Sequence, residues 1–124
     1  MMSQFDVAMA ERLILLVDDD RIVLDSLRLL VQDIGHRAET ANSGAEALSK
    51  LDSTRYDVVI TDSKMPSMDG YAFAQEVRRR HPNVPIILIT GSTSPRTSPH
   101  ISCLMQKPFS LDELRTALSR FAVG

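Results

Sequence analysis

The sequence has very little cysteine and few aromatic residues: among 124 residues there are one cysteine, no tryptophan and 5% aromatic side chains in all. A single cysteine excludes an internal disulfide and a metal site built from several cysteines. The shortage of aromatic rings and the net charge of −2 argue against a stand-alone nucleic-acid-binding protein, which would present stacking platforms or a basic surface. We therefore expect no direct contact with nucleic acid.

Long apolar segments are also missing. The longest unbroken apolar run, Leu13–Val17, is far too short to cross a membrane. Residues 1–10 contain no basic residue and no apolar stretch typical of a secretory signal, so we expect no membrane insertion and a cytoplasmic location. The hydrophobic fraction of 44% and the charged fraction of 24% are those of one globular domain. We predict a tail over residues 1–11 and one folded domain over residues 12–124.

Short apolar segments alternate with segments of helical periodicity along the chain. The expected strands cover residues 13–17, 36–41, 56–61, 84–90 and 102–105, and the expected helices cover residues 20–34, 43–51, 69–80 and 110–121. Gly35 follows the first helical segment, as a C-terminal cap would. This alternation favours a parallel sheet covered on both faces. We predict an α/β fold, a flavodoxin-like three-layer sandwich whose five-stranded parallel sheet has the order 2-1-3-4-5. In such sheets, ligands bind at the carboxyl ends of the strands.

Chemically useful side chains gather where the expected strands end. They are Asp18, Asp19 and Asp20 after the first strand, Asp62 after the third, Thr90 after the fourth and Lys107 after the fifth. Because parallel strands end at one edge of a sheet, these groups should converge. Carboxylates packed together raise the pKa of at least one of them unless a cation compensates. Mg²⁺ takes few protein carboxylates and completes its coordination with water and phosphate oxygens, and the whole set suits phosphoryl transfer.

Each of these residues also has an ordinary structural explanation. Acidic residues favour helix N-termini, which would account for Asp18–Asp20. A lone aspartate at a strand end, such as Asp62, is commonly a turn residue. Thr90 and Lys107 taken alone would be a strand residue and a solvated cation. The functional interpretation is favoured because separate strand ends bring complementary groups to one edge of the sheet.

Several short motifs, in this order, resemble the receiver domain of two-component response regulators, the CheY-like superfamily. They are Val17-Asp18-Asp19-Asp20, Asp62 followed by Met65-Pro66 and Met68-Asp69-Gly70, Thr90-Gly91, and Lys107-Pro108-Phe109. The Asp-x-x-Met-Pro-x-Met-Asp-Gly string together with Lys-Pro-Phe is highly specific, and the similarity extends over residues 12–122.

The resemblance implies that Asp62 would accept a phosphoryl group and form an aspartyl phosphate. Asp19 and Asp62 would ligate Mg²⁺ directly, together with the backbone carbonyl of Lys64, whereas Asp18 would act mostly through water. The phosphoryl group would come from a histidine kinase or a phosphotransfer protein. Any enzymatic activity would be limited to Mg²⁺-dependent self-phosphorylation and slow autodephosphorylation.

The resemblance also implies how the modification is sensed. Lys107 would pair with the phosphoryl oxygens as a point charge, aimed into the site by a cis peptide bond before Pro108. Thr90 would move to hydrogen-bond the phosphoryl group. The added negative charge would then change contacts with a downstream protein. Because only Ala122-Val123-Gly124 follows the last expected helix, we expect a single-domain regulator, although a piece of a larger protein would look the same.

Two features depart from the family pattern. Only 16 residues separate Thr90 from Lys107, and residues 91–100 contain five serine or threonine residues and two prolines. We therefore predict that the fourth helix of the family is reduced to a turn or absent; a short irregular helix is the alternative. Leu104 occupies the position of the family's aromatic switch residue, which puts the usual coupling in doubt. We hypothesise that residues 91–100 become ordered on phosphorylation.

Three questions stay open at the level of sequence. The side chain of Lys64 would either shield the acyl phosphate from water or point to solvent. A pseudo-receiver, an interaction scaffold that works without phosphorylation, is the alternative function, although the complete set of site residues argues against it. A flavodoxin-like nucleotide or flavin binder is disfavoured because Asp18–Asp20 would repel phosphate where such proteins cradle it.

Overall fold

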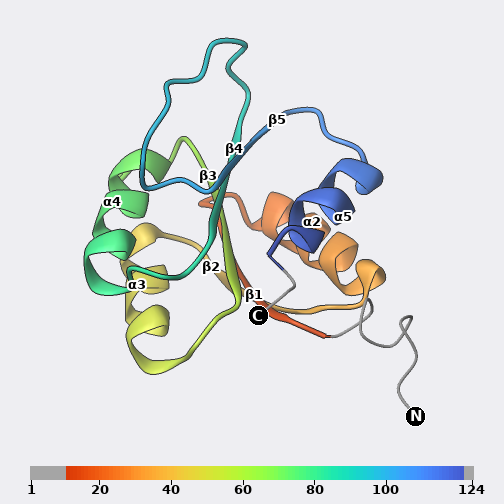
Figure 1. Ribbon diagram of the computed structural model, residues 1–124, viewed down its shortest axis with the longest axis horizontal. Coiled ribbons are helices and arrows are strands. Elements are labelled where there is room, and N and C mark those ends of the chain that lie inside the picture. The colour runs from red at the N-terminus through yellow and green to blue at the C-terminus, as the bar shows by residue number, and fades with distance from the viewer. Residues whose placement is uncertain (1–10, 122–124) are drawn as a thin grey trace.

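A five-stranded sheet with four helices makes up the computed structural model, which describes residues 11–121 (Figure 1). The elements are β1 (Leu13–Val17), α2 (Arg21–Ile34), β2 (Arg37–Ala41), α3 (Gly44–Ser53), β3 (Val58–Asp62), α4 (Gly70–Arg80), β4 (Ile86–Thr90), β5 (Cys103–Gln106) and α5 (Leu111–Ser119). All neighbouring strands pair in parallel in the order β2-β1-β3-β4-β5. The predicted fold class and strand order are confirmed. Residues 1–10 of the predicted tail lie outside the described residues.

Two apolar layers hold the helices against the sheet. Alternate residues of β1 supply both layers: Ile14 and Leu16 pack with α2 and α5, while Leu15 and Val17 pack with α3 and α4. Burial on both faces explains why this strand is an unbroken apolar run. Among the described residues, no helix is both long enough and apolar enough to span a bilayer.

The ends of several elements differ from the predicted ones for local reasons. Gly35 caps α2 with a φ of 114°, as predicted, because this left-handed backbone conformation suits glycine. β3 begins at Val58 rather than residue 56. Asp57, just before it, is already tied to β1: its backbone N–H donates to the carbonyl of Leu13 at 2.8 Å, and its carboxylate accepts a hydrogen bond from the backbone N–H of Leu13. β4 begins at Ile86 because Pro85, before it, has no N–H to donate. The last helix ends at Ser119, two residues earlier than predicted.

Residues 91–102, between β4 and β5, contain no helix, so the predicted loss of the family's fourth helix is confirmed. Serine hydroxyls in this segment accept hydrogen bonds from the amide two residues ahead: Ser92 from Ser94 at 3.1 Å, and Ser98 from His100 at 3.2 Å. These short-range bonds compete with helical ones. In Figure 1 the segment leaves β4, rises beyond the end of the sheet and descends beside the first turn of α4 before it enters β5.

A partly buried histidine beside the start of β1 makes stability depend on pH. The Nδ1 atom of His36 accepts a hydrogen bond from the backbone N–H of Arg12 at 3.1 Å, which requires an unprotonated nitrogen. Burial, and then the Arg12 charge, lower the pKa of His36 from 6.5, against the opposing charges of Glu11 and Asp57. Since the pKa in the fold lies below that of the unfolded chain, the stabilisation is present above pH 6.5 and is lost as the pH falls.

We expect the His36→Gln variant to lose less stability than the parent protein between pH 7.5 and pH 5.5. The difference should be a few tenths to about 1 kcal/mol, because the ring is only partly buried. Urea unfolding of both proteins at the two pH values measures it. Groups that titrate in both proteins cancel in the comparison. Equal losses of unfolding free energy in the two proteins would therefore contradict the assignment of this pH dependence to His36.

Candidate functional site

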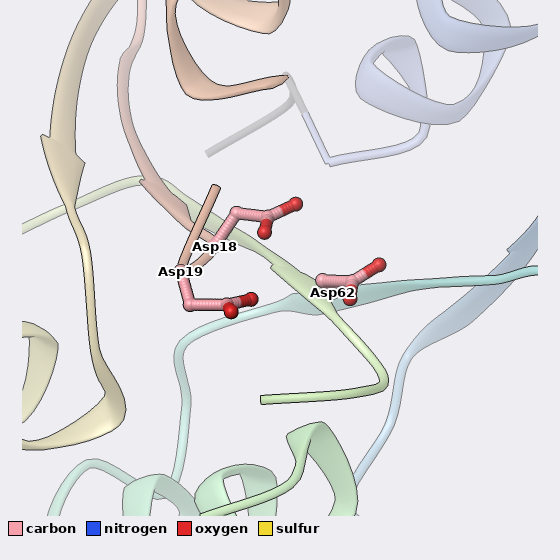
Figure 2. A group of neighbouring side chains, drawn as sticks. All are labelled: Asp18, Asp19 and Asp62. Carbon is pink, nitrogen blue, oxygen red and sulfur yellow. The ribbon is translucent and has the colours of Figure 1, made fainter. Parts of the chain in front are cut away.

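Three carboxylates lie together at the carboxyl end of the sheet (Figure 2). Asp18 and Asp19 follow β1, and Asp62 is the last residue of β3. Each offers a carboxylate oxygen, and these oxygens all lie within 4.8 Å of one another. The first and third strands are neighbours in the sheet, which is why Asp62 meets residues that lie 43 and 44 positions before it in the chain. The structure thus brings together three of the four acidic residues that the sequence placed at this edge.

Burial makes Asp18 the unusual acid of the group. Only 6% of it is exposed, while Asp19 next to it faces solvent. Burial is the main cause that raises the pKa of Asp18 from 3.8 to about 6, and the Asp62 charge adds to it. A hydrogen bond from the Asp20 amide at 3.0 Å and the charge of Lys107 act in the opposite direction. The crowding of carboxylates predicted from the sequence therefore contributes to the raised pKa, but burial contributes most.

Asp20 does not belong to this cluster. Its Oδ1 atom accepts hydrogen bonds from the backbone N–H groups of Ile22 at 2.9 Å and Val23 at 3.4 Å, at the beginning of α2. This residue is therefore the N-cap of the helix, the ordinary explanation that the sequence offered for it.

Asp62 has a defined partner on each carboxylate oxygen. Oδ1 lies 2.7 Å from Nζ of Lys107, and Oδ2 accepts a hydrogen bond from the backbone N–H of Lys64 at 3.2 Å. The side chain of Asp62 is 12% exposed, so it is reachable from solvent but screened on most sides. Lys64 itself is exposed. The peptide bond between Lys107 and Pro108 is cis, as the family resemblance implied.

Thr90 ends the neighbouring strand and is tied to the segment that follows it. The residue is 4% exposed, and its Oγ1 atom accepts a hydrogen bond from the backbone N–H of Ser92 at 3.0 Å. Its carbonyl accepts one from the backbone N–H of Lys107 at 2.8 Å. Thr90 is thus connected through its hydroxyl to the 91–102 segment and through its carbonyl to Lys107, the residue after β5.

A close backbone approach, which the sequence analysis did not predict, fixes the first turn of α4 over Asp62. The backbone N–H of Gly70 donates to the carbonyl of Ser63 at 2.9 Å. A Cβ atom at Gly70 would lie 2.3 Å from the carbonyl oxygen of Asp62 and 2.9 Å from Cδ1 of Leu88. The Asp-Gly pair at the beginning of this helix was the available signal, but only the fold shows what the glycine avoids.

The chemistry of the donor set fits a hard divalent cation. The cluster offers carboxylate oxygens from Asp18, Asp19 and Asp62, which are the ligands that Mg²⁺ prefers, and it contains no soft sulfur ligand. One ammonium group, that of Lys107, stands beside a cluster of three carboxylates. A cation would therefore stabilise the charged form of Asp18 against burial, the main cause of its raised pKa, and against repulsion by Asp62.

Comparison with known proteins gives a consistent result. The profile of the response regulator receiver domain matches residues 14–119. The response regulator MprA of Mycobacterium avium is 36% identical over 108 residues, which cover 82% of this chain and 46% of the relative. The chain thus spans about half the length of that relative.

Solved structures resemble the whole described fold. The response regulator TrrA of Thermotoga maritima, in complex with Mg²⁺ and beryllium fluoride, has a TM-score of 0.83 at 33% identity, over 89% of this chain and 98% of that one. The receiver domain of sensor histidine kinase PA1611 of Pseudomonas aeruginosa, with a magnesium ion in its active-site cleft, has a TM-score of 0.83 at 27% identity, over 93% of this chain and 100% of that one.

Proposed function

The chain belongs to the family of response regulator receiver domains, and on this premise we propose that Asp62 accepts a phosphoryl group from a phosphohistidine. The donor would be a histidine kinase or a phosphotransfer protein, and the modified chain would change its contacts with a downstream protein. The observation that carries the proposal is the position of Asp62, 2.7 Å from Lys107 and within one acidic cluster with Asp18 and Asp19. The proposed unit covers residues 12–124, with residues 1–11 as a tail, in the cytoplasm.

The proposed reaction is a displacement at phosphorus. A carboxylate oxygen of Asp62 forms the new P–O bond, the P–N bond breaks, and the imidazole of the donor leaves with the electron pair. Lys107 lies where its ammonium group would balance the charge of the transferred oxygens. Thr90, at the end of the next strand, would donate its hydroxyl hydrogen to one of those oxygens.

Asp18, Asp19 and Asp62, with the carbonyl of Lys64, would hold a magnesium ion, which would supply positive charge to the phosphoryl oxygens. The three carboxylates would otherwise repel an incoming phosphoryl group. The two neighbouring carboxylates differ in exposure and would have different roles. Exposed Asp19 would ligate the ion directly, while buried Asp18 would act through water.

Intact-mass measurement after incubation with acetyl phosphate and Mg²⁺ tests the function. We expect one added phosphoryl group on the parent protein and none on Asp62→Asn or on the parent in EDTA. Asp112→Asn, which removes an exposed carboxylate on α5, should be phosphorylated like the parent and controls for general effects of losing a charge. No added mass on the parent would contradict the proposal and favour the pseudo-receiver scaffold.

The lifetime of the phosphoryl group should depend on Lys64. This exposed side chain lies two residues past the acceptor, and its backbone N–H already contacts Asp62. We expect Lys64→Ala to raise the autodephosphorylation rate roughly two- to fivefold, because an exposed charge near the pocket contributes about 1 kcal/mol or less. Loss of the phosphorylated mass with time measures the rate. An unchanged rate would mean that the side chain only points to solvent.

A further inference from the structure

The segment between β4 and β5 is held against the first turn of α4 by one arginine. The Arg96 guanidinium carbon lies 4.2 Å from the centroid of the Tyr71 ring, the arrangement of a cation–π contact. The Tyr71 hydroxyl donates a hydrogen bond to the Arg96 carbonyl at 3.0 Å, and Nη2 of Arg96 lies 3.4 Å from Oδ2 of Asp69. We call Arg96, Tyr71 and Asp69 the latch.

The latch is on the surface, so it is easily opened. The Arg96 side chain is 66% exposed and that of Asp69 is 46% exposed, and ion pairs and cation–π contacts at such positions are individually weak. A small difference in interaction energy elsewhere is therefore enough to shift its equilibrium.

One end of the latch is connected to Thr90. Oγ1 of Thr90 accepts the hydrogen bond of the Ser92 amide at 3.0 Å, and Oγ of Ser92 accepts that of the Ser94 amide at 3.1 Å. These two bonds lead from the buried hydroxyl toward Arg96. Gln106, on the strand beside Thr90, also donates from Nε2 to the carbonyl of Ser92 at 3.1 Å.

The other end of the latch is connected to the strand that carries Asp62. Asp69 caps α4 by accepting from the backbone N–H of Ala72 at 2.7 Å, and the backbone N–H of Gly70 donates to the carbonyl of Ser63 at 2.9 Å. Ser63 directly follows Asp62. Both halves of the latch are therefore fixed to residues next to the proposed phosphorylation site.

We propose that the latch reports the state of Asp62 to the protein surface. Tyr71 would be the aromatic reporter, because the position on β5 where the family has an aromatic switch residue is occupied by Leu104. The inference rests on the proposed function. When the Thr90 hydroxyl turns toward a phosphoryl group on Asp62, the Ser92 amide loses its acceptor, the 91–102 segment shifts, and Arg96 leaves the Tyr71 ring. The segment then becomes more mobile, which is the reverse of the ordering expected from the sequence.

Tyrosine fluorescence provides a direct test, because the chain has no tryptophan and only two tyrosines. In a Tyr56→Phe background, Tyr71 is the single reporter. The protein is phosphorylated with acetyl phosphate and Mg²⁺, and intact mass gives the extent in each sample. We expect acrylamide quenching of Tyr71 to increase roughly twofold on phosphorylation as the ring becomes uncovered. The backbone amides of residues 92–94 and of Arg96 should exchange about tenfold faster.

Two arginine variants in the same background locate the effect. Arg96→Gln should be phosphorylated to the same extent but show high quenching before and after. Arg79→Gln removes an exposed arginine that pairs with Glu76 on the same helix, outside the latch, and should keep the full response. Three results would each overturn the latch alone: a gain in mass without any change in Tyr71 quenching, slower exchange of the amides of residues 92–94 and Arg96, or an undiminished response in Arg96→Gln. Absence of any mass gain would overturn the proposed function together with the latch.

Discussion

Replacing Asp18 with asparagine should make the magnesium-free protein more stable by about 1–3 kcal/mol at pH 7.5, and should weaken Mg²⁺ binding by about tenfold or more. The two effects have one cause. Asp18 is 6% exposed and lies beside Asp62, so the folded chain holds a carboxylate where burial and a like charge disfavour it. The unfolded chain has no such penalty.

The direction of the effect follows from the pKa. Because burial raises the pKa of Asp18 in the fold to about 6, above its ordinary 3.8, stability is lost as the pH rises through about 6, and at pH 7.5 the loss is complete. In the parent protein the backbone N–H of Asp20 donates to Oδ1 of Asp18 at 3.0 Å. Asparagine at position 18 removes the charge but keeps a side-chain oxygen that can accept this hydrogen bond. The variant therefore loses the penalty without losing the hydrogen bond.

Urea unfolding in EDTA and in saturating Mg²⁺ measures both parts. The parent should gain more stability from Mg²⁺ than the variant, since only binding to the folded state stabilises it. Asp20→Asn is the matched control, because Asp20 caps α2 and asparagine caps helices equally well. That variant should match the parent in both buffers. An Asp18→Asn protein that is less stable than the parent in EDTA would show that the carboxylate is not under electrostatic strain.

The sequence was sufficient to predict features that depend only on residues close together in the chain. The apolar run of β1, the left-handed cap at Gly35 and the missing helix over residues 91–102 all follow from residue types within a few positions of each other. Asp62 could be placed beside Asp18 and Asp19 because the alternation of strands and helices favours a parallel sheet, and in the order that the family resemblance also implies the first and third strands are neighbours.

The sequence could not predict side-chain orientations and contacts that depend on how the elements pack in three dimensions. Residue type alone does not distinguish Asp20, a helix cap, from Asp18, a buried acid, because both follow the same strand and differ in which way they face. Only the family resemblance assigned a magnesium role to Asp18 and none to Asp20. The contact of Arg96 with Tyr71 joins a loop to a helix across 25 positions. It depends on the path of residues 91–102, for which composition indicated only that no helix forms.

Gly70→Ala should destabilise the protein by about 1–3 kcal/mol, the usual penalty for forcing an extra methyl group into a packed site. The new Cβ would lie 2.3 Å from the carbonyl oxygen of Asp62 and 3.0 Å from Cα of Ser63, both backbone atoms that cannot turn away. The first turn of α4 must therefore move off β3 and break the hydrogen bond from Gly70 to Ser63. The small gain in helix propensity from alanine does not offset this.

Gly91→Ala is the matched control for stability, because a Cβ atom there meets nothing within 4 Å and the backbone of this residue is not left-handed. It should be neutral or slightly stabilising, since alanine restricts the unfolded chain. Urea unfolding of both variants beside the parent measures the difference. Gly70 also approaches the backbone of Asp62, the proposed phosphoryl acceptor. Under conditions where the Gly70→Ala variant is still folded, it should therefore be phosphorylated more slowly by acetyl phosphate than the parent. Equal stability of the two glycine variants would contradict the close approach of α4 to the backbone of Asp62. It would also contradict the connection from Ser63 through α4 to the latch.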